Sequence, residues 1–93
     1  MDASSFEEND KFKVGVTYTA TRLAYYHFAA KCVSRTEKFV TFKISNRAAA
    51  QLHLSKLQVR RKCFNVNGIE TCTLLGDSVD SYNNWVVTAD CLE

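Results

Sequence analysis

The chain has 93 residues, 46% of them hydrophobic and 24% charged, which is typical of a small globular domain and excludes an intrinsically disordered protein. Its net charge of +2 is too small to predict nucleic-acid binding by itself. No apolar run has the length of a membrane span, and the acidic first residues lack the basic and apolar regions of a signal peptide. We therefore expect a cytoplasmic protein with no membrane partner.

Charge is distributed unevenly along the chain. Residues 11–62 contain all 12 lysine and arginine residues and a single acidic residue, Glu37. In the segments 1–10 and 63–93 every charged side chain is acidic. Opposite charges could interleave once the chain folds. Alternatively, the basic residues form a face that meets phosphate or an acidic protein surface.

Strands are predicted in chain order from the alternation of apolar and polar residues. Residues 12–19 predict a strand with a bend or bulge at Gly15, and residues 20–26 a connection to the next strand, 27–33. The polar segment 34–38 predicts a hairpin turn into a strand over 39–44, where Val40, Phe42 and Ile44 share an apolar face. Residues 46–54 predict a loop with one helical turn.

The clearest local structure is a β-hairpin over residues 56–75, closed by Asn67-Gly68. A two-residue type I′ turn needs positive φ at both central positions, and Asn-Gly supplies it readily. Counting back from this turn places Cys63 opposite Cys72 as a non-hydrogen-bonded pair, with Cβ atoms about 4.5–5.5 Å apart. Residues 76–84 then predict a turn-rich loop, and residues 85–91 the last strand.

These segments predict an all-β protein, or a mainly β one with a single short helix. Five or six short antiparallel strands form a small SH3-like or OB-like barrel most readily, because closing the sheet hides its edges. An open β-sandwich is the alternative. We expect residues 1–10 to form an acidic flexible tail and residues 11–93 a single small β-barrel domain.

The four cysteines, Cys32, Cys63, Cys72 and Cys91, are candidate zinc ligands. Zinc binds four thiolates tetrahedrally at about 2.3 Å, and such a site would be structural because it leaves no position for water. The chain has no Cys-x-x-Cys motif, and His27 or His53 could replace a cysteine. Thiols packed in the core and a disulfide are the alternatives.

The run Arg60-Arg61-Lys62 is the densest positive charge in the chain and, together with Lys56, predicts a partner-binding surface. On a strand, Arg60 and Lys62 point one way and Arg61 the other, and Phe64 is expected on the face of Arg60 and Lys62. Such a surface predicts a nucleic-acid-binding small β-barrel as one possible function, with an ordinary solvated strand face as the other interpretation.

The sequence lacks a nucleophile elbow and a glycine-rich phosphate loop, and neither histidine belongs to a recognisable catalytic arrangement. We therefore expect no catalytic residue and no enzyme activity. Acidic residues in the segments 7–10 and 77–80 are candidates for imitating phosphate towards a basic nucleic-acid channel, or else solubilising side chains.

The order of several short motifs resembles that of a known group of proteins. The motifs are Gly15-Val16-Thr17-Tyr18, the segment 33–41 (VSRTEKFVT), and Arg60-Arg61-Lys62 followed by Gly68-Ile69-Glu70. Over roughly residues 12–90 this order resembles small proteins encoded by phages and mobile elements of Gram-positive bacteria, some of which are anti-CRISPR inhibitors of type II CRISPR effector nucleases. The segment 48–54 and the lack of a proline after Gly76 depart from the pattern.

The resemblance implies a non-enzymatic inhibitor in the cytoplasm of a host bacterial cell. It would bind a type II CRISPR effector nuclease and block nucleic-acid loading. Direct binding of nucleic acid through the Arg60-Arg61-Lys62 strand is the alternative function.

Overall fold

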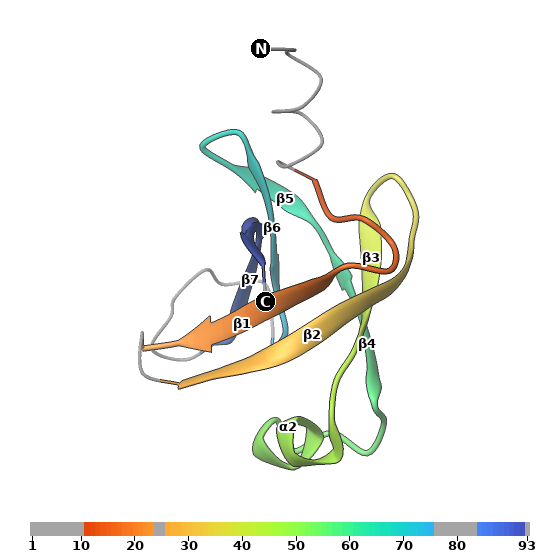
Figure 1. The fold of residues 1–93 in the computed structure, drawn as a ribbon, viewed down its shortest axis with the longest axis vertical. Coiled ribbons are helices and arrows are strands. Elements are labelled where there is room, and N and C mark those ends of the chain that lie inside the picture. Colours follow the sequence, from red (N-terminus) through yellow and green to blue (C-terminus); the bar gives the residue numbers. More distant parts are fainter. Residues whose placement is uncertain (1–10, 24–25, 76–83, 93) are drawn as a thin grey trace.

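The structure, a computed structural model, describes residues 11–23, 26–75 and 84–92. Its strands are β1 (Thr17–Arg22), β2 (Tyr26–Arg35), β3 (Phe39–Lys43), β4 (Gln58–Lys62), β5 (Phe64–Val66), β6 (Ile69–Thr73) and β7 (Val86–Leu92). The helix α2 (Asn46–Gln51) lies between β3 and β4 in the chain. The strands form one antiparallel sheet in the order β4-β3-β2-β1-β7-β6-β5, curled into a nearly closed barrel (Figure 1). The predicted small, mainly β barrel with a short helix is confirmed.

The barrel closes through one run of chain that changes its partner strand at Cys63. Before this residue β4 pairs with β3, and after it β5 pairs with β6 at the other edge of the sheet. The N–H of Cys63 donates to the carbonyl of Lys38 at 2.7 Å, while the next residue, Phe64, already pairs with Thr71. The break divides this run into two short strands, which is why the seven-stranded sheet exceeds the predicted five or six strands.

The predicted bend at Gly15 is confirmed, but the strand expected over 12–19 begins only at Thr17. Gly15 has a φ of +92°, and its N–H donates to the carbonyl of Cys32 at 2.8 Å. After the bend, β1 continues to Arg22, which pairs with Tyr26 of β2. The connection predicted over 20–26 is therefore too long, because backbone pairing with β2 extends this strand without an alternating apolar face.

The hairpin predicted over residues 56–75 is confirmed at its turn and in the register of residues 64–66 with 69–71, but it is wrong before Cys63, because β4 pairs with β3 and not with β6. Asn67 and Gly68 have φ values of 54° and 85°, as a type I′ turn requires. The strands pair as predicted, with Asn65 opposite Glu70 next to the pair that flanks the turn. The side-chain oxygen of Asn65 also accepts a hydrogen bond of 2.8 Å from the Gly68 N–H, which stabilises the turn.

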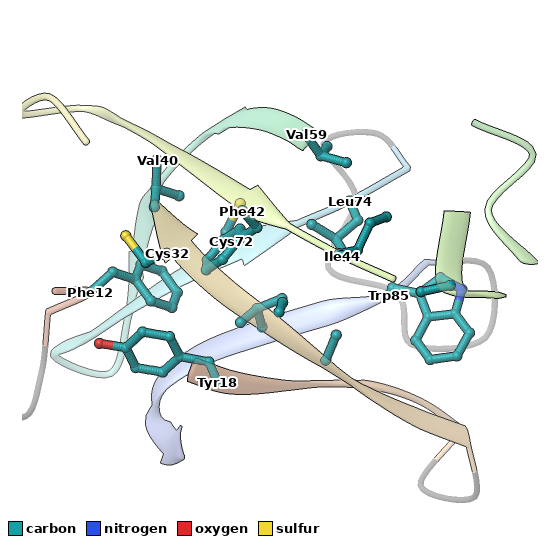
Figure 2. Packing of buried hydrophobic residues seen from close by; sticks show 14 of the residues in the cluster. Phe12, Tyr18, Cys32, Val40, Phe42, Ile44, Val59, Cys72, Leu74 and Trp85 are labelled. Atoms are coloured by element: carbon teal, nitrogen blue, oxygen red, sulfur yellow. The ribbon is translucent and has the colours of Figure 1, made fainter. Parts of the chain in front are cut away.

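Aromatic rings fill one end of the core. Phe12 packs edge-to-face against Tyr18 and Phe42, with ring centres 4.9 Å and 5.1 Å apart. Figure 2 shows Phe12, Tyr18 and Cys32 at this end of the core and Trp85 at the other. The apolar face predicted for residues 39–44 is confirmed, since Val40, Phe42 and Ile44 are all buried.

The single helical turn predicted over residues 46–54 corresponds to α2. The hydroxyl of Ser45 accepts a hydrogen bond of 3.1 Å from the Ala48 N–H and so caps the first turn. Ala48 and Ala49 are buried against the core. The helix covers one end of the barrel (Figure 1), and the chain then enters β4.

The tail predicted over 1–10 and most of the loop predicted over 76–84 lie outside the described residues. The division of the chain into an acidic tail (residues 1–10) and a single barrel domain (residues 11–93) therefore stays a prediction. Among the residues that are described, no helix has the length and apolarity needed to cross a membrane.

Candidate nucleic-acid interface

Exposed basic side chains occupy paired positions on the outer surface of β2, β3 and β4. Lys31 of β2 pairs with Lys43 of β3, and Lys43 pairs with Gln58 of β4. Directly paired residues in an antiparallel sheet project from the same face. All of these side chains are exposed, so the two lysines lie beside each other on the outside of the barrel.

The strand β4 continues this surface. Arg60 and Lys62 are exposed, whereas Val59 is buried and Arg61 is half-buried, which confirms that the basic run is divided between two faces. The guanidinium carbon of Arg60 lies 4.1 Å from the ring centre of Phe39 on β3, a cation–π contact that holds its planar group over the ring. We define the basic face as Lys31, Lys43, Arg60, Lys62 and Phe39.

Acidic side chains do not interleave with this basic face within its own strands. No aspartate or glutamate occurs in β2, β3 or β4. All 12 lysine and arginine residues belong to the described part of the chain, but only Glu37, Glu70 and Asp90 of the ten acidic residues do. Like charges opposite each other across strands are destabilising. An anionic partner would relieve this repulsion.

A pocket of about 280 Å³ lies at the start of β4, beside the basic face. It is lined by three of the four predicted partner-binding residues, Lys56, Arg60 and Arg61, and by the apolar Val59 and Leu74 among others. We call this pocket the basic groove. The fourth predicted residue, Lys62, lies further along β4 and opposite Phe39 on the basic face.

Arg61 also has a structural part in the barrel. Its Nε–H donates a hydrogen bond of 2.9 Å to the backbone carbonyl of Thr73 on β6. These two strands are not paired with each other in the sheet, so the contact joins the edge strand β4 to β6, the strand next to the other edge, where the barrel closes. Arg61, a predicted partner-binding residue, therefore also contributes to the fold.

The aromatic member of the basic face is Phe39, which sequence reasoning did not select. The expected aromatic neighbour, Phe64, instead lies half-buried beyond the break at Cys63 and lines a second pocket. The break ends the alternation of faces that the expectation assumed. Phe39 could have been found from the sequence only with the register of β3 on β4, which places it opposite Lys62.

The structure brings Cys63 and Cys72 together, as the hairpin register predicted. A side-chain hydrogen bond between the two thiols lowers the pKa of Cys63; the same contact, together with burial, raises the pKa of Cys72, whose Sγ also donates to the backbone carbonyl of Thr73 at 3.8 Å. Cys32 and Cys72 are fully buried among apolar side chains (Figure 2), as expected for packed core thiols. All four cysteines are free thiols.

The four cysteines do not assemble into the predicted zinc site. Within the described ranges, which include every cysteine and both histidines, no group of three or more His, Cys, Asp or Glu side chains could hold a metal ion. The cysteines come from separate parts of the sheet, because Cys32 pairs with Phe42 of β3, Cys72 pairs with Val87 of β7, and Cys91 follows Val87 beyond an irregular stretch of β7.

No protein-family model, no curated protein and no solved structure matches this chain. Its function is therefore inferred from the geometry of the basic face and the basic groove.

Proposed function

We propose that this chain is a small β-barrel that binds single-stranded nucleic acid through the basic face and the basic groove. The carrying observation is the exposure of Lys31, Lys43, Arg60 and Lys62 on adjacent strands that contain no acidic residue. A contact surface of this kind provides the electrostatic term that dominates affinity for a phosphate backbone.

The spacing of these cations suits an extended phosphate chain. Neighbouring strands lie about 4.8 Å apart, and residues on the same face of a strand lie about 7 Å apart. Lys43 and Arg60 therefore belong to one continuous track of positive charge rather than to an isolated site. A single strand can follow such a track without the fixed groove geometry of a duplex.

The basic groove adds a place for a base. Its apolar residues, Val59 and Leu74, lie beside the cationic side chains of Lys56 and Arg60. A phosphate would meet the cations of the groove while its base packs beside them. Sequence-tolerant single-strand binders combine such a positively charged groove with aromatic stacking surfaces, and Phe39 is the aromatic residue of the basic face. The planar guanidinium of Arg60, oriented by Phe39, offers a further stacking surface.

Fluorescence anisotropy with labelled oligothymidine and oligouridine over a series of salt concentrations tests this proposal. For single strands, the slope of log affinity against log salt is about −0.7 per phosphate contact, so the double variant Lys43→Ala/Lys62→Ala should flatten it by about 1.4. The matched control is Lys11→Ala/Arg47→Ala, which removes the same charge from exposed residues outside the basic face.

Absence of binding at low salt would refute the proposal. Equal losses in the two double variants would also contradict it, because they would show that net charge alone drives the binding. If a duplex bound as tightly as the single strands, the proposed ligand class would change from single-stranded nucleic acid to nucleic acid in general.

The inhibitor function implied by the motif order stays a prediction. The acidic residues of segments 7–10 and 77–80, which were expected to imitate phosphate, lie outside the described residues. The strands β2, β3 and β4, which carry the basic face, contain no acidic residue, and this favours direct contact with nucleic acid. A structural zinc is not part of the proposal, since the described cysteines do not gather around one point.

A further inference from the structure

Cys63 and Cys72 form a pair of facing thiols at the point where the barrel closes. The pairing of β5 with β6 ends at Phe64 opposite Thr71, Cys63 and Cys72 are the next residues of the two chain segments, and a side-chain hydrogen bond links their thiols. At a non-hydrogen-bonded position the Cβ atoms lie about 4.5–5.5 Å apart, and a disulfide needs about 3.5–4.5 Å. A small approach of the two strands would therefore permit a bond.

The two thiols differ in their access to a reagent. Cys72 is fully buried, whereas Cys63 is half-buried and lines a pocket of about 400 Å³. Lys11 and Lys38 line the same pocket, together with Glu37 and Glu70. Glu70 forms an ion pair with Arg35. Glu37 is then the one carboxylate of the lining that has no ion pair with a described residue to oppose the two lysines. A small anionic reagent can thus reach Cys63 first.

We propose that Cys63 and Cys72 are a reactive thiol pair that small anionic disulfides oxidise to an intramolecular disulfide. The Cys63 thiolate attacks one sulfur of the reagent, whose S–S bond breaks and releases one thiolate. The Cys72 thiol then loses its proton to solvent, and its sulfur attacks Cys63 Sγ and displaces the second thiolate. Two electrons pass from the protein to the reagent, and the released thiolates take up the two protons.

This chemistry uses a different part of the barrel from the proposed nucleic-acid interface. Cys63 is the residue at which the chain passes from β3 to β6 as its partner strand. A bond to Cys72 would link that junction covalently to β6, close to the hydrogen bond between Arg61 and Thr73. Neither thiol lines the basic groove, so failure of one proposal leaves the other standing.

Oxidised glutathione, added to the fully reduced full chain, is the probe. The expected product has lost two hydrogen atoms by intact mass, with Cys63 linked to Cys72. Trypsin alone leaves Cys63, Cys72 and Cys91 on one peptide after Lys62, so a second cleavage after Glu70 is needed to separate the partners. Samples quenched early with N-ethylmaleimide should carry glutathione on Cys63 before any other cysteine.

Two variants complete the test. Cys72→Ser should stop at a mixed disulfide on Cys63, and the control Cys91→Ser should react as the unaltered chain does. If Cys72→Ser does not fold, the early-quenched sample of the unaltered chain gives the same information. A first adduct on Cys32 or Cys91, a bond between any other two cysteines, or no reaction in the folded protein would overturn the proposal.

Discussion

Arg35 of β2 and Glu70 of β6 form an ion pair with two parallel contacts. The Nη1 and Nη2 atoms of Arg35 lie 2.6 Å and 3.0 Å from the Oε1 and Oε2 atoms of Glu70. The same groups hold the backbone of Phe12, whose N–H donates to Glu70 Oε1 at 2.8 Å and whose carbonyl accepts from Arg35 Nη1 at 2.6 Å. This clamp fixes the segment before the Gly15 bend and places the Phe12 ring in the core.

Replacing Glu70 by glutamine should destabilise the barrel. Glu70→Gln removes the charge that pairs with Arg35, and the side chains of both residues are largely buried, with 14% and 22% of their surface exposed. The expected loss is about 2 kcal/mol in the free energy of unfolding, measured by urea denaturation. The control Glu37→Gln changes an exposed carboxylate in the β2–β3 turn and should cost less than about 0.5 kcal/mol. Equal losses of unfolding free energy in the two variants would contradict the stabilising role of the Arg35–Glu70 ion pair.

The same ion pair predicts how stability depends on pH. Burial by itself would raise the pKa of Glu70, but hydrogen bonds from Arg35 and the Phe12 N–H hold this pKa below its ordinary value of 4.5. A carboxyl group whose pKa is lowered on folding adds stability above its unfolded pKa, and that contribution is lost as the pH falls through the folded value. The pKa of Arg35 is raised by its hydrogen bond with Glu70, so the arginine stays charged throughout.

We therefore expect the difference in urea midpoint between the unaltered chain and Glu70→Gln to have its largest value at pH 6 to 7. It should shrink progressively below about pH 4.5. A difference that stays constant down to about pH 2 would show that the carboxylate does not carry the effect.

Substitutions of the adjacent residues Arg60 and Arg61 in β4 should affect different properties, nucleic-acid binding and stability respectively. Arg61→Ala removes the hydrogen bond to Thr73 across the barrel closure and should lower the free energy of unfolding by about 1–2 kcal/mol. Arg60→Ala removes only an exposed contact over Phe39, which should cost at most about 1 kcal/mol, yet it should weaken binding of oligothymidine. Urea denaturation and anisotropy on the same samples separate the two effects, and a reversed order would contradict the assignment.

Elemental analysis of protein purified without added metal decides the zinc hypothesis. The positions of the described cysteines lead us to expect well below one zinc per chain. Cys91→Ser should then leave the thermal midpoint within about 2 °C of the unaltered chain, because it removes no ligand. One zinc per chain, lost together with the fold on chelation, would instead support a four-cysteine site in a rearranged barrel.

The inhibitor hypothesis predicts loss of target cleavage when equimolar protein is added to a type II CRISPR effector nuclease with its guide RNA. Under the nucleic-acid-binding proposal, any loss should disappear when excess unrelated single-stranded DNA competes for the basic face. Inhibition that survives the competitor would favour the inhibitor hypothesis. Absence of inhibition across a panel of such nucleases would count strongly against it.

The parts of the fold that depend on local chemistry were predictable from the sequence. Asn67-Gly68 specifies its turn through backbone conformation alone, and the turn fixes the pairing of β5 with β6 by counting residues. The alternation in residues 39–44 likewise identified the buried face of β3, because it reflects which side chains leave water. The division of Arg60, Arg61 and Lys62 between two faces followed from the same period of two.

The candidate interface was only partly predictable, because its members come from three strands. The sequence identified the basic run of β4, but Lys31 and Phe39 join it only through the pairing of β2, β3 and β4. Cross-strand register at these positions is set by packing and by the bulge between Cys32 and Ser34, which the residue pattern does not show.

By itself, then, the sequence determined a small antiparallel β protein, the hairpin at Asn67-Gly68 and the neighbouring positions of Cys63 and Cys72. Only the tertiary structure decided that the four described cysteines do not form one group of metal ligands and that Arg61 of the edge strand β4 bonds to β6. It also decided that one stretch of chain changes partners at Cys63. The physical reason is the distance along the chain between the residues that interact. Turn conformation and strand alternation act within a few residues, whereas the closure of a sheet depends on contacts between residues far apart in the chain.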